Sequence, residues 1–363
     1  MKLNLKTNTN IVYGRGILEK YGTEMLKLGE KPLIVSGKKS SKNSQGYKDL
    51  LEFFKKNDIK YSVYIKSEIM ANIKDIEEGA EIGRKEKCDY VVAVGGGTTI
   101  DIGKGISILL KNKSIKNRGN VPLVTIPTIS GSGSETSKYA VINLDEINFY
   151  TIEVEPNMAI VDPYYTNKIN IELVKNSSLN GLSNLIEGYL NENIDKENER
   201  IAIEGLRRFG ESIDNLLDCN ISSRDRENLS MASILGGILL NRYGRGLFNV
   251  LGETLSYNGN LSLGKSKGIL YNEYLKKFRK EKKLNNIINV LGFSTFRDLS
   301  KTINKLSSYN KVELEKLEVE KLAKISMQRI IKEDKKLKNE IYYDIFNIYS
   351  NSLKNRELNY DII

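Results

Sequence analysis

Short apolar runs alternate with amphipathic stretches over roughly the first 160 residues of this chain. Several runs are apolar at nearly every position, which is typical of strands buried on both faces of a parallel sheet. The runs that we expect to be strands are residues 32–36, 61–65, 89–94 and 123–126. Between them, residues 50–54 and 73–86 place apolar side chains at helical spacing. The alternation predicts a doubly wound α/β domain built on a parallel sheet.

The pattern changes after Asp162–Pro163. Strand signals fade, and apolar residues recur at helical spacing, as in residues 182–189 and 312–332. We therefore predict an α/β domain over residues 1–163 and an all-helical domain over residues 164–363, with the ligand cleft between them.

Composition and charge exclude several function classes. The net charge of +10 alone would suit a nucleic-acid-binding protein. The lysines, however, are spread along the whole chain without a nucleic-acid-binding motif, so we expect no nucleic-acid partner. No apolar run reaches the ~18–20 residues of a membrane span, so we expect no membrane partner. Cys88 and Cys219 are far apart and form no metal-type pair, which fits a reducing cytoplasm.

A glycine-rich segment follows the third predicted strand. Residues 95–104 read Gly-Gly-Gly-Thr-Thr-Ile-Asp-Ile-Gly-Lys, and a helix is expected to begin near Thr98. Exposed N–H groups and the helix dipole at such a point favour a diphosphate, and glycine lets the backbone approach the anion closely. Any tight strand-to-helix turn could use the same glycines, so this segment alone does not decide the function.

A second segment, residues 127–135, reads Pro-Thr-Ile-Ser-Gly-Ser-Gly-Ser-Glu and follows the next predicted strand. Together, in this order, the two segments resemble those of iron-containing alcohol dehydrogenases, relatives of glycerol dehydrogenase and dehydroquinate synthase. The resemblance extends over roughly residues 11–353. It implies that both loops hold a nicotinamide dinucleotide. The residues that match the family's motif are Gly95, Gly96, Gly97, Thr98, Asp101, Thr128 and Ser132.

The end of the first predicted strand bears on the choice of dinucleotide. An acidic residue there would bind the ribose 2′-hydroxyl of NAD. This chain has Gly37, Lys38 and Lys39 instead, followed by Ser-Ser-Lys at residues 40–42. No carboxylate repels a 2′-phosphate, so we expect NADP(H) to be preferred over NAD(H). A solvated lysine-rich loop is the other interpretation of the same residues.

The resemblance also implies a metal site, and here the chain departs from the family. Family members usually hold iron or zinc with one Asp and three His, and this chain has no histidine. The matching positions are Asn180, Asn184, Asn249 and Lys267. Neutral amides are poor ligands for these metals, and an ammonium repels a dication, so we expect no bound metal. Drift in an asparagine-rich chain and a retained polar cavity both explain the asparagines.

Without a metal, other groups must activate a substrate. Lys267 could place an ammonium near a developing negative charge. Glu253, Tyr257 or Tyr139 could supply a proton. A substrate such as an iminium ion or a conjugated alkene is already electrophilic and needs no Lewis acid. Each of these side chains also has an ordinary structural interpretation, as a surface cation, a solvated helix residue or a core aromatic.

These observations predict a metal-independent, NADP(H)-dependent oxidoreductase. We expect it to reduce the carbonyl, imine or activated alkene of a small molecule or biosynthetic intermediate, as a cytoplasmic homodimer. One alternative is a catalytically inactive pseudoenzyme that binds nucleotide and acts as a partner or regulator. A second alternative is a non-redox lyase or cyclase.

Overall fold

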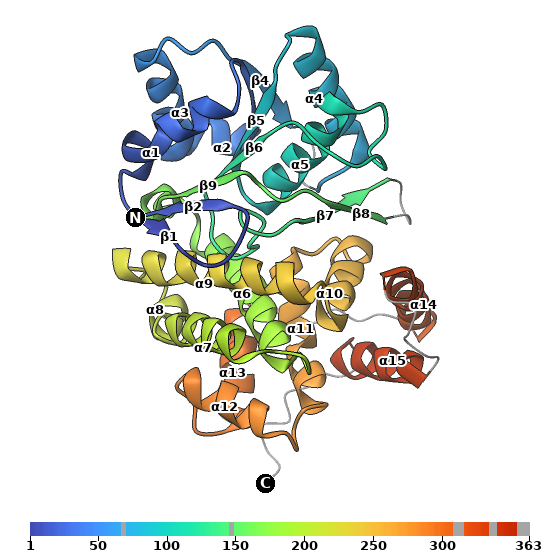
Figure 1. Cartoon of the computed structure of the whole chain (residues 1–363). Helices are drawn as coiled ribbons and strands as arrows, with labels where there is room; N and C mark the ends of the chain where they lie inside the picture. The colour runs from blue at the N-terminus through green and yellow to red at the C-terminus, as the bar shows by residue number, and fades with distance from the viewer. Residues whose placement is uncertain (67–69, 145–148, 308–315, 334–339, 354–363) are drawn as a thin grey trace. The chain divides into compact units, whose positions relative to one another are not determined.

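The computed structural model describes residues 1–66, 70–144, 149–307, 316–333 and 340–353 (Figure 1). The chain forms two compact units. The sheet unit comprises Met1–Asn170 and Ser222–Arg242. The helical unit comprises Ile171–Ile221 and the described residues from Tyr243 onward.

The sheet unit is built on seven strands in the order β1-β2-β9-β6-β5-β3-β4. Every neighbouring pair is parallel except β1 and β2. The strands are β1 (Lys2–Leu3), β2 (Asn10–Tyr13), β3 (Pro32–Gly37), β4 (Ser62–Lys66), β5 (Tyr90–Gly95), β6 (Leu123–Pro127) and β9 (Met158–Val161). The four strands predicted from the sequence are β3 to β6. A separate antiparallel pair joins β7 (Tyr139–Asn143) to β8 (Phe149–Glu153).

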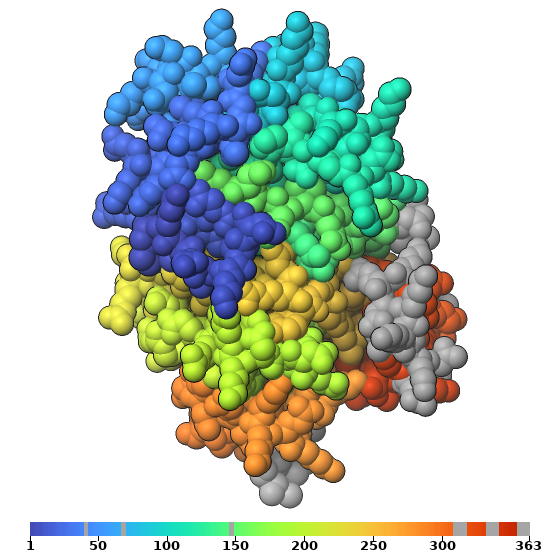
Figure 2. Space-filling view, viewed as in Figure 1, coloured from blue at the N-terminus to red at the C-terminus, as the bar shows by residue number. Residues whose placement is uncertain are grey.

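Helices cover both faces of this sheet. Alternate strand residues point to opposite faces, so Ile34 and Val92 belong to one buried cluster whereas Val35 and Ala93 belong to the other. The first cluster receives α1 (Ile17–Met25) and α3 (Gln45–Lys56), and the second receives α4 (Ile73–Lys85) and α5 (Gly97–Lys111). A short helix, α2 (Lys38–Asn43), follows β3, and two 3₁₀ helices, η1 (Leu26–Leu28) and η2 (Pro163–Thr166), complete the unit's connections. In the space-filling view the N-terminal segment, in blue, forms much of the visible surface of this unit (Figure 2). The predicted doubly wound fold is confirmed.

The compact units differ from the predicted division at residue 163 in the placement of α9 (Ser223–Tyr243). Nearly all of this helix groups with the sheet unit, where Asn241 Oδ1 accepts a hydrogen bond from the Lys138 N–H at 2.5 Å. Thr136 Oγ1 donates to the Ile234 carbonyl at 3.1 Å. Helical spacing in the sequence predicts the helix, but it does not say which core the helix packs against.

The described part of the helical unit is built from helices. They are α6 (Ile171–Leu190), α7 (Lys196–Gly210), α8 (Ile213–Leu217), α10 (Leu247–Asn258), α11 (Leu263–Lys276), α12 (Lys282–Val290), α13 (Phe296–Leu306), α14 (Lys316–Glu333) and α15 (Glu340–Leu353). Helix α11 packs against both α6 and α10, and the Phe248 ring stacks on Tyr274 with centroids 4.3 Å apart. The predicted helix at residues 312–332 corresponds to α14, and its first residues lie outside the described chain. Over the described ranges, no helix combines the length and apolar character needed to cross a membrane.

Candidate functional site

The two predicted cofactor loops lie side by side in the sheet unit. β5 and β6 are neighbours with Gly95 opposite Pro127, so the loops that follow them leave the same edge of the sheet. The Thr128 N–H donates to the Gly95 carbonyl at 3.0 Å. A Cβ on Gly97 would lie 2.8 Å from Ser132 Oγ, so the contact between the loops requires glycine. The structure thus brings together residues that are far apart in the sequence.

The first loop has the geometry of an anion site. Gly96 is the N-cap of α5, and no side chain caps the helix there. Gly96, Gly97 and Thr98 are partly exposed, whereas the strand before them and most of the helix after them are buried. The free N–H groups of a long helix are therefore accessible to a ligand, and they favour a phosphate group.

Helix α9 holds the second loop in place. Ser233 Oγ accepts hydrogen bonds from the Gly131 and Gly133 N–H groups at 2.8 and 3.2 Å, and it donates to Glu135 Oε1 at 2.8 Å. Gly133 has a φ of +68° and lies against Gly237 of α9, where a Cβ on Gly133 would be 2.7 Å from backbone atoms. Sequence reasoning missed Ser233 and Gly237, because small residues on a helix carry no signal of their partner.

A buried charge cluster lies beneath these loops. Lys104 Nζ donates to the Tyr139 carbonyl at 2.8 Å and lies 3.8 Å from Asp101 Oδ1. Burial lowers the pKa of Lys104 to about 8, although Asp101 and Glu135 oppose the shift. Burial also raises the pKa of Glu135. Asp101, predicted to bind cofactor, thus lies beside Lys104, and Tyr139, predicted to donate a proton, contacts Lys104 through its backbone carbonyl.

The predicted cofactor-choosing segment follows β3. Gly37 ends this strand, which neighbours β5, and Lys38 and Lys39 begin α2 as exposed residues. They thus leave the same edge of the sheet as the glycine loop. The side chains of residues 40–42 lie outside the described part of the structure.

In the helical unit, two of the three asparagines that match the family's metal ligands bind the ammonium at the fourth position, Lys267. Lys267 of α11 has no exposed surface. Its Nζ donates to Asn180 Oδ1 at 2.6 Å, Ser183 Oγ at 2.7 Å and Asn249 Oδ1 at 2.7 Å. A lysine ammonium has three hydrogens, so these bonds use every donor it has. Asn184 is buried on the same helix as Asn180.

A buried carboxylate, Glu187, binds the same Asn249 side chain. Glu187 Oε1 accepts from the Phe248 N–H at 2.6 Å, and Oε2 accepts from the Asn249 N–H at 3.2 Å and from Asn249 Nδ2. Burial raises the pKa of Glu187, and nearby Lys267 opposes the shift. Burial also lowers the pKa of Lys267 to about 8. Sequence reasoning missed Ser183 and Glu187, although their spacing from Asn180 places them on the same face of α6.

The chain is similar to known proteins both in sequence and in fold. Residues 8–163 match the sequence profile described as iron-containing alcohol dehydrogenase. A crystal structure of an iron-containing alcohol dehydrogenase superposes with a TM-score of 0.86 at 28% identity, covering 96% of this chain and 98% of that chain. An iron-containing alcohol dehydrogenase from Thermotoga maritima also gives 0.86, at 27% identity, over 96% of this chain and 99% of that chain. Residues 8–163 of this chain thus match the iron-containing alcohol dehydrogenase family, and the fold of the chain is similar to that of these two dehydrogenases.

Curated relatives match over shorter stretches. The NADH-dependent butanol dehydrogenase B of Clostridium acetobutylicum is 31% identical over 196 residues, which are 50% of this chain and 50% of that protein. The NAD-dependent methanol dehydrogenase of Bacillus methanolicus is 24% identical over 249 residues, which are 65% of each protein. The matches therefore span about half to two thirds of the length of these relatives.

The residues at the family's metal positions do not fit a metal ion. The Oδ1 atoms of Asn180 and Asn249 face the ammonium of Lys267 and accept hydrogen bonds from it, so the lysine occupies the space that a metal ion would need. A dication at this point would also be repelled by the ammonium. Among the described residues, no group of three or more His, Cys, Asp or Glu could hold a metal ion.

The other predicted catalytic residues are placed as follows. Glu253 of α10 is buried and forms ion pairs with Arg245 and, at 2.6 Å, with Arg329. Burial alone would raise the pKa of Glu253, but these two cations hold it below its ordinary value. An ionised, doubly paired carboxylate is poorly suited to donate a proton. Tyr257 lies one turn further along α10 and is partly exposed.

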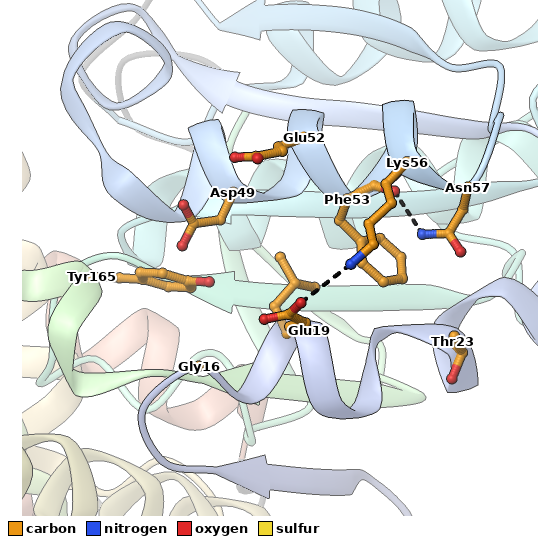
Figure 3. A pocket seen from close by; sticks show the side chains of 10 residues that line it. Gly16, Glu19, Thr23, Asp49, Glu52, Phe53, Lys56, Asn57 and Tyr165 are labelled. Carbon is orange, nitrogen blue, oxygen red and sulfur yellow. Dashed lines mark hydrogen bonds and ion pairs between the residues drawn. The ribbon is translucent and has the colours of Figure 1, made fainter.

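A cavity of about 460 Å³ lies elsewhere in the sheet unit, between α1, α3 and η2 (Figure 3). Glu19, Asp49 and Glu52 line it, and its one lysine, Lys56, pairs with Glu19 at 3.2 Å. None of the predicted cofactor-binding residues contributes to its wall. Three carboxylates facing one lysine make this cavity unsuitable for a diphosphate.

Proposed function

We propose that the chain is a nicotinamide-dinucleotide-dependent oxidoreductase that works without a bound metal ion. The paired loops carry this proposal, because they present the uncapped start of α5 beside Ser132 and are joined through the Thr128–Gly95 hydrogen bond. Relatives named as NAD- or NADH-dependent alcohol dehydrogenases support the same class of reaction. In family members that bind a metal, the ion polarises the substrate oxygen.

The state of Lys267 narrows the substrate class. Its ammonium is buried and its three hydrogens are engaged, so a direct hydrogen bond to a substrate would require one of them to leave Asn180, Ser183 or Asn249. An ordinary ketone or aldehyde needs a group that stabilises its developing negative charge. We therefore favour a substrate that is already electrophilic, such as an imine in its protonated form or a conjugated alkene, over an unactivated carbonyl.

We propose NADP(H) as the preferred form of the cofactor, because exposed Lys38 and Lys39 follow β3 directly. The relatives named above are NAD- or NADH-dependent, so they favour the opposite preference. The homodimeric state and the cytoplasmic location remain predictions from the sequence.

One observation also favours a second function. The ammonium of Lys267 is saturated and Glu253 is doubly ion-paired, so neither of these two predicted catalytic residues is placed to donate a proton. A pseudoenzyme that binds dinucleotide without transferring hydride would have this arrangement.

Calorimetric titration with NADPH and NADH tests the cofactor site. We expect binding of at least one, with NADPH tighter, and Gly96→Glu should abolish it by placing a carboxylate at the diphosphate position. Lys113→Gln, just beyond the other end of α5, changes the net charge equally and should bind normally. Absence of binding to the wild type would refute the proposal. Binding without hydride transfer to any carbonyl, imine or activated alkene would establish the pseudoenzyme.

A further inference from the structure

The ammonium of Lys267 joins three helices of the helical unit. Its hydrogen-bond acceptors come from α6, through Asn180 and Ser183, and from α10, through Asn249, while the lysine itself belongs to α11. Two of these acceptors are at positions where the family places metal ligands. A positive charge at this point therefore makes the same connections between helices that a coordinated ion would make.

The residue packed against the stem of this lysine is a glycine, Gly252. A Cβ on Gly252 of α10 would lie 2.4 Å from Lys267 Cγ and 3.1 Å from its Cε. Real side chains do not tolerate such approaches, so the aliphatic stem of Lys267 requires glycine at that position. The lysine is thus packed along its whole length, and its position is not that of a surface cation folded inward.

The same cluster also contains a counter-ion for Lys267. The Asn249 amide accepts from Lys267 through Oδ1 and donates to Glu187 through Nδ2, so it connects the ammonium to a counter-ion. This pairing fixes the orientation of the amide, because only its oxygen can face the ammonium. Glu187 is held in turn by the N–H groups at the start of α10.

We propose that the ammonium of Lys267 is the resident cation of this pocket and takes over the structural place of the metal ion, with Glu187 as its counter-ion. The inference deepens the metal-free part of the proposed function. It does not depend on catalysis, because its tests read metal binding and stability. A failure to find hydride transfer would therefore leave it intact.

The first test removes the charge. Lys267→Met keeps the length of the stem, leaves three acceptors without a donor and deprives Glu187 of its cation. We expect the thermal midpoint to fall by roughly 5–15 °C. Lys265→Met, on the same helix but partly exposed, should change it by less than about 2 °C. Adding Glu187→Gln to Lys267→Met should recover part of the loss. Equal midpoints for the two single variants would overturn the proposal.

The second test restores ligands at the four positions. The variant carries Asn180→Asp, Asn184→His, Asn249→His and Lys267→His, and it is compared with the wild type after dialysis against Zn²⁺ and removal of excess metal. We expect one Zn²⁺ per chain and a raised thermal midpoint for the variant, and no stoichiometric metal for the wild type. A folded variant that binds no Zn²⁺, or a wild type that retains one Fe or Zn per chain, would contradict the assignment of Lys267 to the place of the metal.

Discussion

Gly133 offers a sharp test of how the second of the two predicted cofactor loops is held. Its φ is +68°, in the left-handed region, and a Cβ there would lie 2.7 Å from the Cα and N of Gly237 and 3.1 Å from the Ser233 carbonyl. All three contacts are with backbone, which cannot move aside as a flexible side chain can. Gly133→Ala should therefore combine backbone strain with a collision against α9.

Gly16 provides a matched control in the same unit. Its φ is +65°, but nothing lies within 4 Å of the position that a Cβ would occupy. Gly16→Ala should cost only the strain of a left-handed alanine, about 1–2 kcal/mol. Gly133→Ala should cost about 1–3 kcal/mol more, the usual range for overpacking. The difference between the two variants isolates the contact between the loop and α9.

Urea unfolding followed by far-ultraviolet circular dichroism measures both losses, since the chain has no tryptophan to report by fluorescence. Cofactor titration should show weakened binding for Gly133→Ala, because Ser132 and the N–H groups bound by Ser233 must shift. Gly16→Ala should bind cofactor normally. Equal stability losses, or unchanged cofactor affinity in Gly133→Ala, would show that α9 does not position the loop.

Two further predictions concern buried charges. Burial lowers the pKa of Lys104 to about 8 from an ordinary 10.5, so the unfolded chain binds more protons than the folded chain between these pH values. The free energy of unfolding of the wild type should therefore rise by up to about 3 kcal/mol relative to Lys104→Met as pH rises through that window. Urea titrations at about pH 7 and about pH 10 measure this rise, and a constant difference between the two proteins would contradict it. Arg329→Met should lower the free energy of unfolding, measured in urea, by about 2–4 kcal/mol, because it leaves Glu253 paired with Arg245 alone. Adding Glu253→Gln to this variant should recover part of the loss, whereas additive losses would argue against the pairing.

The sheet and the first cofactor loop were predictable because their signals are local. The strand β5 is buried at all six positions, so its sequence is apolar on both faces. The glycines after it mark a close backbone approach wherever they occur. The second loop was predictable only through the family resemblance, since Ser and Gly in a short segment fit many turns.

The placement of α9 shows what local patterns cannot supply. The helix is buried at every residue from Asn228 to Leu239, so no polar face indicates which core it belongs to. Its attachment to the second loop depends on Ser233 and Gly237, whose roles exist only when Gly133 lies opposite. Such pairings are properties of two segments at once, and a single sequence does not display them.

The same reasoning bears on the asparagines at the metal positions, for which drift and a retained polar cavity were both open. Random substitution toward asparagine would leave buried amides without partners. Each unsatisfied group would lower the stability of the fold by about 1–3 kcal/mol. Here the Oδ1 atoms of Asn180 and Asn249 both face one ammonium, and Gly252 makes room for its stem. An amide is a poor ligand for iron but a good acceptor for an N–H group, so these two replacements suit Lys267. The pattern favours a cavity kept polar around Lys267 over independent drift.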